Sequence, residues 1–326
     1  MKIYVTQPIP PAGLEVLRRA YPNFQMNPDE RVLSRAELLE QIKGCDATLT
    51  LLTDKIDGEA LDAAGPQLRV VANMAVGFDN IDLPAATARG VMATNTPGVL
   101  NDATADHAWA LLFAAARRIP ESEKFLRAGK FKNWGPLLFL GGDVTGRTLG
   151  IIGAGRIGHN MALKSRGFNM RVLYADEMPN PKLEQEIGAR KVSVEELLAE
   201  SDFVSLHVPL LPSTKHLINA NSLRLMKKTA YLINTSRGPV VDETALADAL
   251  KNGVIAGAAL DVFENEPLIH PELMKLDNIV LTPHTASATI ETRSKMATMA
   301  AKNIIAALAG QKPPNLVNEE VWKSDD

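Results

Sequence analysis

The stretch 148–176 constrains the fold of this chain more than any other. It reads TLGIIGAGRIGHNMALKSRGFNMRVLYAD: an apolar run, the glycine pattern Gly153-Ala-Gly155-Arg-Ile-Gly158, a helical pattern, and a second apolar run ending on Asp176. Strand, glycine loop, helix, strand and acid, in this order, form the context that a dinucleotide-binding fingerprint requires. The stretch therefore predicts a βαβ unit that binds a dinucleotide. The alternative is an α/β turn whose glycines serve packing alone.

Each residue of the pattern has a physical role in such a unit. Gly153 permits the tight turn, Gly155 lets a pyrophosphate approach the backbone, and Gly158 lets the helix pack closely on the sheet. The amides and the positive dipole end of that helix then face the diphosphate. Asp176 is placed to accept hydrogen bonds from ribose hydroxyls, whereas a 2′-phosphate there would meet like charge, to which Glu177 adds. The sequence therefore predicts NAD as cofactor, with NADH preferred over NADPH.

Composition excludes several other classes of protein. The chain has 326 residues, 46% hydrophobic and 22% charged, with a formal net charge of −3, so it is long enough for two globular domains. This charge gives no reason to expect nucleic acid or an acidic membrane as partner. The single cysteine, Cys45, excludes an internal disulfide and a cysteine-cluster metal site, and no metal is expected. Without a visible signal peptide or membrane-spanning run, we expect a cytoplasmic protein.

The first hundred residues alternate between strand and helix patterns. The expected strands are 2–5, 47–52, 68–74 and 91–95, and the expected helices are 11–20, 34–43, 58–64 and 83–89. This βα repeat implies a parallel sheet covered on both faces. Because the repeat is complete before the glycine fingerprint begins, we expect it to form a separate domain.

The segment between the two βα blocks is rich in apolar residues. Its first part, 101–118, is apolar nearly all round and predicts a buried helix. The linker that follows, 120–142, carries Phe125, Phe131 and Trp134. A linker so rich in aromatic residues is expected to pack on a partner subunit, which predicts a homodimer.

The alternation resumes after the fingerprint. The expected strands are 202–209, 230–236, 254–263 and 278–284, and the expected helices are 194–200, 221–227, 243–251 and 288–308. The last helix is assigned to the first domain, and the tail 319–326 is expected to be mobile. The predicted fold class is α/β, with two Rossmann-like/flavodoxin-like domains, doubly wound parallel sheets and an active site in the interdomain cleft. The substrate domain is discontinuous, 1–100 plus 286–326, and the NAD-binding domain is 101–285.

Residues that could carry chemistry follow the strands of the second sheet, where open α/β sheets bind ligands. Arg237, Glu266 and His284 are expected at this edge. Hydride transfer to a carbonyl needs an acid–base group, a cation for a substrate carboxylate and correct placement. Histidine suits the first role, since its pKa lies near neutrality, and a neighbouring carboxylate keeps it protonated. The planar guanidinium of arginine suits the second role.

Competing assignments remain open on the residues alone. Glu264 competes with Glu266 as the partner of the histidine, and His207, at the end of a strand, competes with His284. His207 belongs to the sequence HVP and is better suited to shaping a loop near the cofactor. The remaining histidines are expected in structural helices or in polar loops with no visible partner: His107, His159, His216 and His270.

At this point the chain resembles a known family over essentially its whole length. The matching pieces are MAVGFDNID (74–82), GRTLGIIGAGRIG (146–158), HVPLLPST (207–214), LINTSRGPVVDETAL (232–246), AALDVFENEP (258–267) and LTPH (281–284). They are similar, in order and spacing, to the D-isomer-specific 2-hydroxyacid dehydrogenases. Within that family the closest resemblance is to the glyoxylate/hydroxypyruvate reductases.

The resemblance implies a role for each matching residue. Arg237 would bind the substrate carboxylate and carbonyl, Glu266 would pair with His284, and His284 would act as general acid–base. The backbone amides of Ala75, Val76 and Gly77 would hold the substrate carboxylate. The positions expected to contact the cofactor are Thr104, Gly153, Gly155, Arg156, Ile157, Gly158, Asp176, His207, Val208, Pro209, Thr214, Thr235, Ser236, Asp261 and His284.

The reaction implied is NADH-dependent reduction of a small 2-oxo acid, such as glyoxylate or hydroxypyruvate, to the 2-hydroxy acid. Two alternatives stay open. One is a D-2-hydroxyacid dehydrogenase for a bulkier 2-oxo acid, since sequence does not show pocket size. The other, of a different class, is an NAD-sensing, corepressor-like binding protein. The Arg237, Glu266 and His284 set argues against the second alternative.

Overall fold

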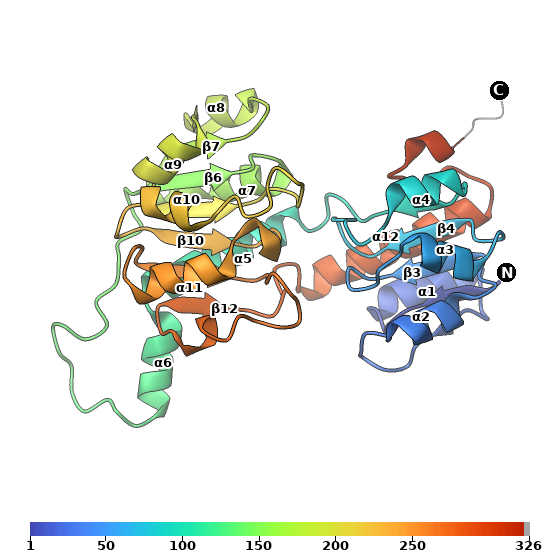
Figure 1. Cartoon of the computed structure of the whole chain (residues 1–326), viewed down its shortest axis with the longest axis horizontal. Coiled ribbons are helices and arrows are strands. Elements are labelled where there is room, and N and C mark those ends of the chain that lie inside the picture. Colours follow the sequence, from blue (N-terminus) through green and yellow to red (C-terminus); the bar gives the residue numbers. More distant parts are fainter. Residues whose placement is uncertain (323–326) are drawn as a thin grey trace. The chain divides into compact units, whose positions relative to one another are not determined.

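A computed structural model of the chain describes residues 1–322, and contacts group the chain into two compact units. Unit 1 combines Met1–Leu100 with the segment that begins at Ala288, and unit 2 is the continuous stretch Asn101–Ser287. Each unit has its own parallel sheet with helices on both faces (Figure 1). No helix within residues 1–322 is long and apolar enough to cross a membrane.

Unit 1 is a doubly wound five-stranded sheet with strand order β2-β1-β3-β4-β5. This is the flavodoxin-like order. The strands are β1 (Ile3–Val5), β2 (Gln25–Met26), β3 (Ala47–Thr50), β4 (Val70–Asn73) and β5 (Met92–Thr94). The helices are α1 (Pro11–Ala20), α2 (Arg35–Ile42), α3 (Gly58–Ala64), α4 (Leu83–Ala88) and α12 (Ile290–Leu308). The edge strand β2 was not predicted.

Local chemistry explains where the helices of unit 1 begin. Ser34 and Glu37 form a reciprocal capping box at α2, and the side chains of Asp57 and Asp82 cap α3 and α4. The first helix packs on the last one: a Cβ built on Gly13 of α1 would lie 2.6 Å from the Cβ of Ala297 in α12. Of the predicted mobile tail, Glu319–Val321 forms a 3-10 turn and 323–326 lie outside the described residues.

Unit 2 is a seven-stranded parallel sheet with strand order β12-β11-β10-β9-β6-β7-β8. Counted within the unit, this is the Rossmann order with a seventh strand added at one edge. The strands are β6 (Thr148–Ile152), β7 (Arg171–Ala175), β8 (Arg190–Lys191), β9 (Phe203–Leu206), β10 (Tyr231–Asn234), β11 (Gly257–Leu260) and β12 (Ile279–Leu281). The helices are α5 (Asn101–Ala116), α6 (Ile119–Arg127), α7 (Arg156–Lys164), α8 (Pro181–Ile187), α9 (Val194–Glu200), α10 (Ala220–Leu225) and α11 (Glu243–Lys251).

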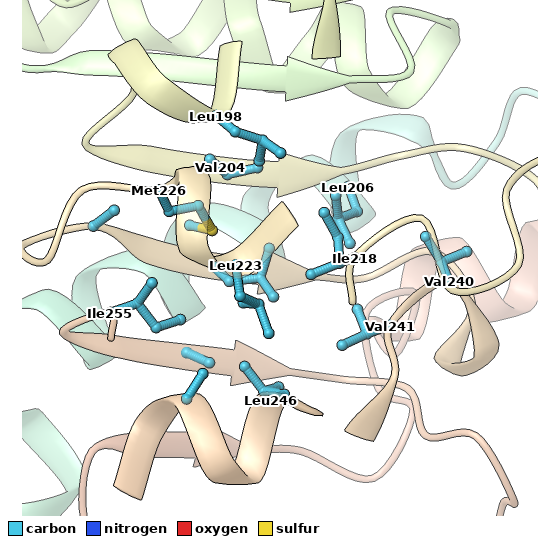
Figure 2. Packing of buried hydrophobic residues seen from close by; sticks show 14 of the residues in the cluster. Leu198, Val204, Leu206, Ile218, Leu223, Met226, Val240, Val241, Leu246 and Ile255 are labelled. Atoms are coloured by element: carbon cyan, nitrogen blue, oxygen red, sulfur yellow. The ribbon is translucent and has the colours of Figure 1, made fainter. Parts of the chain in front are cut away.

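Alternating side chains of the central strands fill two separate cores in unit 2. Val204 and Leu206 of β9 belong to a cluster covered by α9, α10 and α11, part of which is shown in Figure 2. Phe203 of the same strand points to the opposite face, where it joins Trp109 of α5 and Met161 of α7. Because successive side chains of a strand alternate between faces, the sheet is buried on both sides. The apolar helix predicted over 101–118 is thus part of a core, as α5.

The segment after α5 differs from its prediction. The stretch 120–142 was interpreted as a linker, yet Ile119–Arg127 forms helix α6, with Pro120 in its first turn. In Figure 1, α6 and the chain that follows it (green) extend away from the other elements of unit 2. Several apolar side chains there face solvent, Trp134 at 77% and Leu137 at 79% exposure.

Candidate active site

Loops that follow the strands of unit 2 meet at one edge of its sheet, because all of its strands are parallel. β10 ends at Asn234, just before Arg237. β11 ends at Leu260, and the loop after it carries Glu266; β12 ends at Leu281, shortly before His284. The strand order therefore brings the three predicted catalytic residues to one edge.

His284 and Glu266 form the central pair of this edge. Nδ1 of His284 lies 2.9 Å from Oε2 of Glu266, and each side chain is 27% exposed. The second carboxylate oxygen accepts the backbone N–H of Phe263 at 3.0 Å, which fixes the direction of the carboxylate. Nε2 of His284 makes no hydrogen bond to a side chain or backbone group within residues 1–322. A histidine oriented at one nitrogen in this way can exchange a proton at the other.

Electrostatics keep the Glu266 carboxylate charged. Its burial alone would raise the pKa of the carboxyl group. The hydrogen bond and the charge of His284, together with the Phe263 amide and the charge of Arg237, outweigh burial and lower the pKa of Glu266 below its ordinary value. An anionic Glu266 is a strong acceptor for the Nδ1–H group of the imidazole and so fixes its orientation.

The backbone around His284 is held in an unusual conformation. His284 has a φ of 53°, in the left-handed region that non-glycine residues seldom adopt. Its N–H donates to the carbonyl of Asp261 at 2.9 Å, and the Asp261 carboxylate accepts the amides of Thr285 and Ala286, each at 2.8 Å. Asp261 is fully buried, and Nε2 of His107 lies 3.3 Å from its carboxylate. Asp261 thus holds the amide of the histidine and the amides of the two residues that follow it.

The turn that carries Arg237 is organised by a residue that was not predicted. Asn234, which is fully buried, accepts hydrogen bonds from the backbone and side chain of Ser236 and donates to the carbonyl of Arg237 at 2.9 Å. The next residue, Gly238, lies against the loop after β11, where a Cβ would overlap the Phe263 carbonyl. A side chain at this position would separate the arginine turn from the Glu266 loop. An asparagine at the end of an apolar strand was the available signal.

A second histidine–carboxylate pair corrects two of the interpretations above. His216, expected to have no partner, places Nε2 2.5 Å from Oε1 of Glu264. Glu264 is therefore bound elsewhere and does not compete with Glu266 for His284. Glu264 and the buried Glu243 also bind each other's backbone N–H groups, at 3.0 and 2.7 Å. The amide of His270 donates to Glu243 at 3.2 Å. These contacts tie the loop that carries Glu266 to the start of α11.

The glycine loop has the geometry that its sequence predicts. Gly153 has a φ of 92°, and a Cβ there would lie 2.7 Å from the backbone of His207. A Cβ on Gly158 would overlap the Gly153 carbonyl, so α7 can approach β6 only without a side chain. Around Gly155 there is open space within 4 Å. Gly155 precedes α7, whose first residues are Arg156 and Ile157, so the amides of the first helical turn are available to an anion.

Two predicted cofactor residues carry buried polar atoms without a partner. Oγ1 of Thr235 and Nδ1 of His207 are inaccessible and make no hydrogen bond within residues 1–322. Nε2 of His207 is bound by Ser205, at 2.9 Å from its Oγ. Orphaned polar atoms at a sheet edge are typical of a site completed by a ligand. With the open backbone at Gly155, they fit a dinucleotide laid along this edge.

The burial of His207 predicts how stability depends on pH. Burial lowers the pKa of His207 from 6.5 to about 3. Below pH 6.5 His207 becomes protonated in the unfolded chain but stays neutral in the folded chain. The contribution of neutral His207 to the free energy of unfolding is therefore present above pH 6.5 and is lost as pH falls toward 3. The loss is at most about 1.4 kcal/mol per pH unit. Denaturant unfolding between pH 8 and pH 4 measures this. The free energy of unfolding of His207→Gln should depend less steeply on pH than that of the unmodified chain, and parallel curves for the two proteins would contradict the prediction.

Other predicted cofactor positions differ in how they are used. Oγ1 of Thr214 donates to the carbonyl of Pro209 at 2.6 Å and accepts the amide of Leu211, so Thr214 closes its own loop. Val208 lies against Gly153, 2.9 Å from a Cβ built there. Thr104 is buried on α5.

The predicted substrate loop, 75–77, lies in unit 1 after β4. Its carbonyls are all engaged: the amide of Thr96 donates to Ala75, Asn95 donates to Val76, and Asn73 donates to Gly77. The amides of Val76 and Gly77 make no hydrogen bond within the described part of the chain. A loop with bound carbonyls and free amides can accept an anion.

Residues 1–322 hold no group of three or more side chains suited to a metal ion.

A Rossmann sheet with a glycine loop, and a histidine–carboxylate pair at the same edge, are the parts of a nicotinamide-dependent oxidoreductase. Comparison with known proteins identifies the family of oxidoreductases to which the chain belongs. The chain belongs to the D-isomer-specific 2-hydroxyacid dehydrogenase family, whose NAD-binding-domain model matches residues 109–286. It is therefore an NAD-dependent oxidoreductase that acts on a CH–OH group.

Individual relatives match the chain over nearly its full length. A glyoxylate reductase of Korarchaeum cryptofilum is 53% identical over 324 residues, which cover 99% of this chain and 97% of that protein. A crystal structure of a Thermus thermophilus protein has a TM-score of 0.90 and 43% identity, covering 97% of this chain and 100% of that one. An NADPH-dependent glyoxylate/hydroxypyruvate reductase of Sinorhizobium meliloti, solved with NADP and malonate, has a TM-score of 0.85 and 32% identity, covering 100% and 99%.

Proposed function

We propose that this chain reduces small 2-oxo acids, glyoxylate and hydroxypyruvate among them, with NADH, and that His284 is the general acid. The pairing of His284 with Glu266 is the observation that carries the proposal, because it orients an imidazole through Nδ1 and leaves Nε2 for proton transfer at the edge where the dinucleotide loop also lies. The relatives named glyoxylate reductase support the choice of substrate.

The proposal assigns a role to each of the site residues. His284 donates the proton at Nε2 to the carbonyl oxygen of the substrate, and Glu266 holds the imidazole in orientation and stabilises its charge. Arg237 binds the substrate carboxylate and polarises the carbonyl, because its planar guanidinium matches that geometry. Within unit 1, the amides of Val76 and Gly77 are the groups that we propose for binding a substrate carboxylate. The nicotinamide ring, when bound, supplies the hydride that reduces the carbonyl carbon.

Asp176 is the proposed basis for preferring NADH. Its carboxylate lies at the end of β7, next to the exposed Glu177, where a 2′-phosphate would meet negative charge. The Sinorhizobium relative is NADPH-dependent, so the family accommodates both cofactors and the preference must come from local residues. We expect kcat/KM for NADH to exceed that for NADPH by at least about tenfold.

We also propose a homodimer that uses α6 and the chain after it. Trp134 and Leu137 are more than three-quarters exposed, and Phe131 and Leu140 are at least half exposed. Apolar side chains concentrated on one extended segment are typical of a surface that another chain covers. Light scattering should give twice the 35.3 kDa mass of one chain; a monomer would exclude this arrangement.

The function is tested by following NADH oxidation with glyoxylate, hydroxypyruvate, pyruvate and phenylpyruvate side by side, and then repeating the series with NADPH. Fast turnover of the first two acids with NADH is the expected result. Turnover of phenylpyruvate alone would move the substrate to a bulkier 2-oxo acid. Tight NADH binding without turnover of any of the four would favour an NAD-sensing, corepressor-like protein instead.

A further inference from the structure

The loop after β7 binds the residue between the first two glycines of the fingerprint from both sides. The amide of Ala154 donates to Oδ2 of Asp176 at 2.7 Å, and the carbonyl of Ala154 accepts Nδ2 of Asn180 at 2.8 Å. Ala154 itself is buried, at 5% exposure, so neither group has water as an alternative partner. The segment expected to contact the ribose and the segment expected to contact the diphosphate are therefore bound to one another.

Asn180 is the hub of these contacts. Its Oδ1 accepts the amide of Leu183 at 3.0 Å, as the N-cap of α8, and its backbone N–H donates to the hydroxyl of Tyr174 at 2.9 Å. The hydroxyl of the fully buried Tyr174 in turn donates to Glu184 of α8. Nδ2 of Asn180 also lies 3.3 Å from Nδ1 of His159 on α7. Asn180 thus joins four elements: its side chain contacts α8, α7 and the glycine loop, and its backbone N–H contacts β7.

The chemistry of the amide explains why this position suits asparagine. One end of the side chain faces the Leu183 N–H and must accept, while the other faces the Ala154 carbonyl and must donate. An aspartate would place an oxygen against the carbonyl oxygen of Ala154. A serine could cap α8 but is too short to reach that carbonyl.

We propose that Asn180 is a positioning residue for the adenosine half of the cofactor. It holds the loop of Asp176 against the glycine loop, so that the groups that bind the ribose and the diphosphate form one preformed surface. One carboxylate oxygen of Asp176 accepts the amide of Ala154. The other oxygen lies 3.3 Å from the Met178 amide and is the one that we assign to the ribose. Without Asn180, Ala154 keeps its hydrogen bond to the Asp176 side chain but loses the one to its carbonyl, so that binding must order the two segments further. The proposal rests on the proposed function only in that the dinucleotide occupies this edge.

The test compares Asn180→Ser with Ser193→Ala. Asn180→Ser keeps a capping oxygen for α8 and removes the donor to Ala154. Ser193→Ala removes the cap of α9, where Oγ of Ser193 accepts the Glu196 amide at 3.1 Å, and leaves the glycine loop untouched. Binding of NADH is measured by fluorescence titration, and steady-state kinetics are measured with glyoxylate at saturating NADH.

We expect Asn180→Ser to raise the Kd for NADH about five- to tenfold. The kcat at saturating NADH and the KM for glyoxylate should stay within about twofold of those of the unmodified chain. An unchanged Kd in Asn180→Ser, or an equal rise in Ser193→Ala, would overturn the proposal. Since the titration needs no 2-oxo acid, a chain that failed to reduce glyoxylate would still report on Asn180.

Discussion

Replacing His284 with asparagine should lower kcat for glyoxylate by about a hundred- to ten-thousandfold, the range that a positioned general acid contributes. Asparagine is chosen because it tolerates the left-handed φ of 53° better than alanine does. The backbone that Asp261 holds should therefore persist, and the loss should reflect the missing proton donor. Stopped-flow measurement of NADH oxidation at saturating substrate gives kcat, and fluorescence titration gives the Kd for NADH, which should change little.

His216→Asn is the matched control for this experiment. His216 also has a left-handed φ, 50°, and is also paired with a glutamate, but it contacts Glu264 rather than the reacting edge. Its replacement should cost less than about tenfold in kcat, because it can act only through the loop that Glu264 fixes. Turnover of His284→Asn within a few-fold of the unmodified chain would refute the acid–base role. Equal losses of kcat in the two variants would indicate that a disturbed loop, and not the missing proton donor, is the cause.

Replacing Arg237 with glutamine should lower kcat/KM for glyoxylate by roughly a hundred- to a thousandfold, because a charge-assisted pair with the substrate carboxylate is lost. Arg237→Lys keeps the charge but not the planar pair of donors, so it should recover only part of the activity. The effect should appear with the 2-oxo acid and not in the Kd for NADH. Initial rates over a range of glyoxylate concentrations separate the two.

Arg171→Gln provides the comparison for Arg237. Arg171 begins β7 at the opposite edge of the same sheet, where its guanidinium pairs with Glu200 at the surface. Such a surface pair contributes about 1 kcal/mol or less to stability and has no part in binding the substrate. A fall in kcat/KM of Arg171→Gln as large as that of Arg237→Gln would show that loss of a positive charge from unit 2, and not this position, is responsible. An Arg237→Gln enzyme with unchanged kcat/KM would remove the residue from the site.

Sequence reasoning reached the fold because the strongest patterns are local. The order of strand, glycine loop, helix and acid over 148–176 is legible in the residues themselves, and it is the order of β6, α7 and β7 in the structure. The alternation of unit 1 was equally clear. Short elements were missed: β2 and β8 have two residues each, which is too few for a periodic pattern. Helix α6 was missed because the aromatic and glycine residues after it dominate the composition of that segment.

Contacts between distant residues could not be predicted in the same way. His216 and Glu264 are 48 positions apart, and nothing in either neighbourhood indicates the other. The left-handed backbone at His284 depends on Asp261, a residue of a different strand's loop. Asn180 left a weak signal, an Asn-Pro pair at the start of a helical pattern, but that signal indicates a cap and not a contact with the glycine loop. Local sequence determines elements, whereas the pairing of side chains across a sheet edge depends on topology.

The return of the chain to unit 1 has a consequence for the order of folding during synthesis. Unit 2 is continuous, so all of its strands are available once Ser287 has left the ribosome. Unit 1 must wait, because the helix that packs on α1 is α12, the last helix of the chain, and the contact of Gly13 with Ala297 closes a loop that contains all of unit 2. Until then the apolar face covered by α12 is open to chaperones or to aggregation. The residues that emerge first are the last to complete their core.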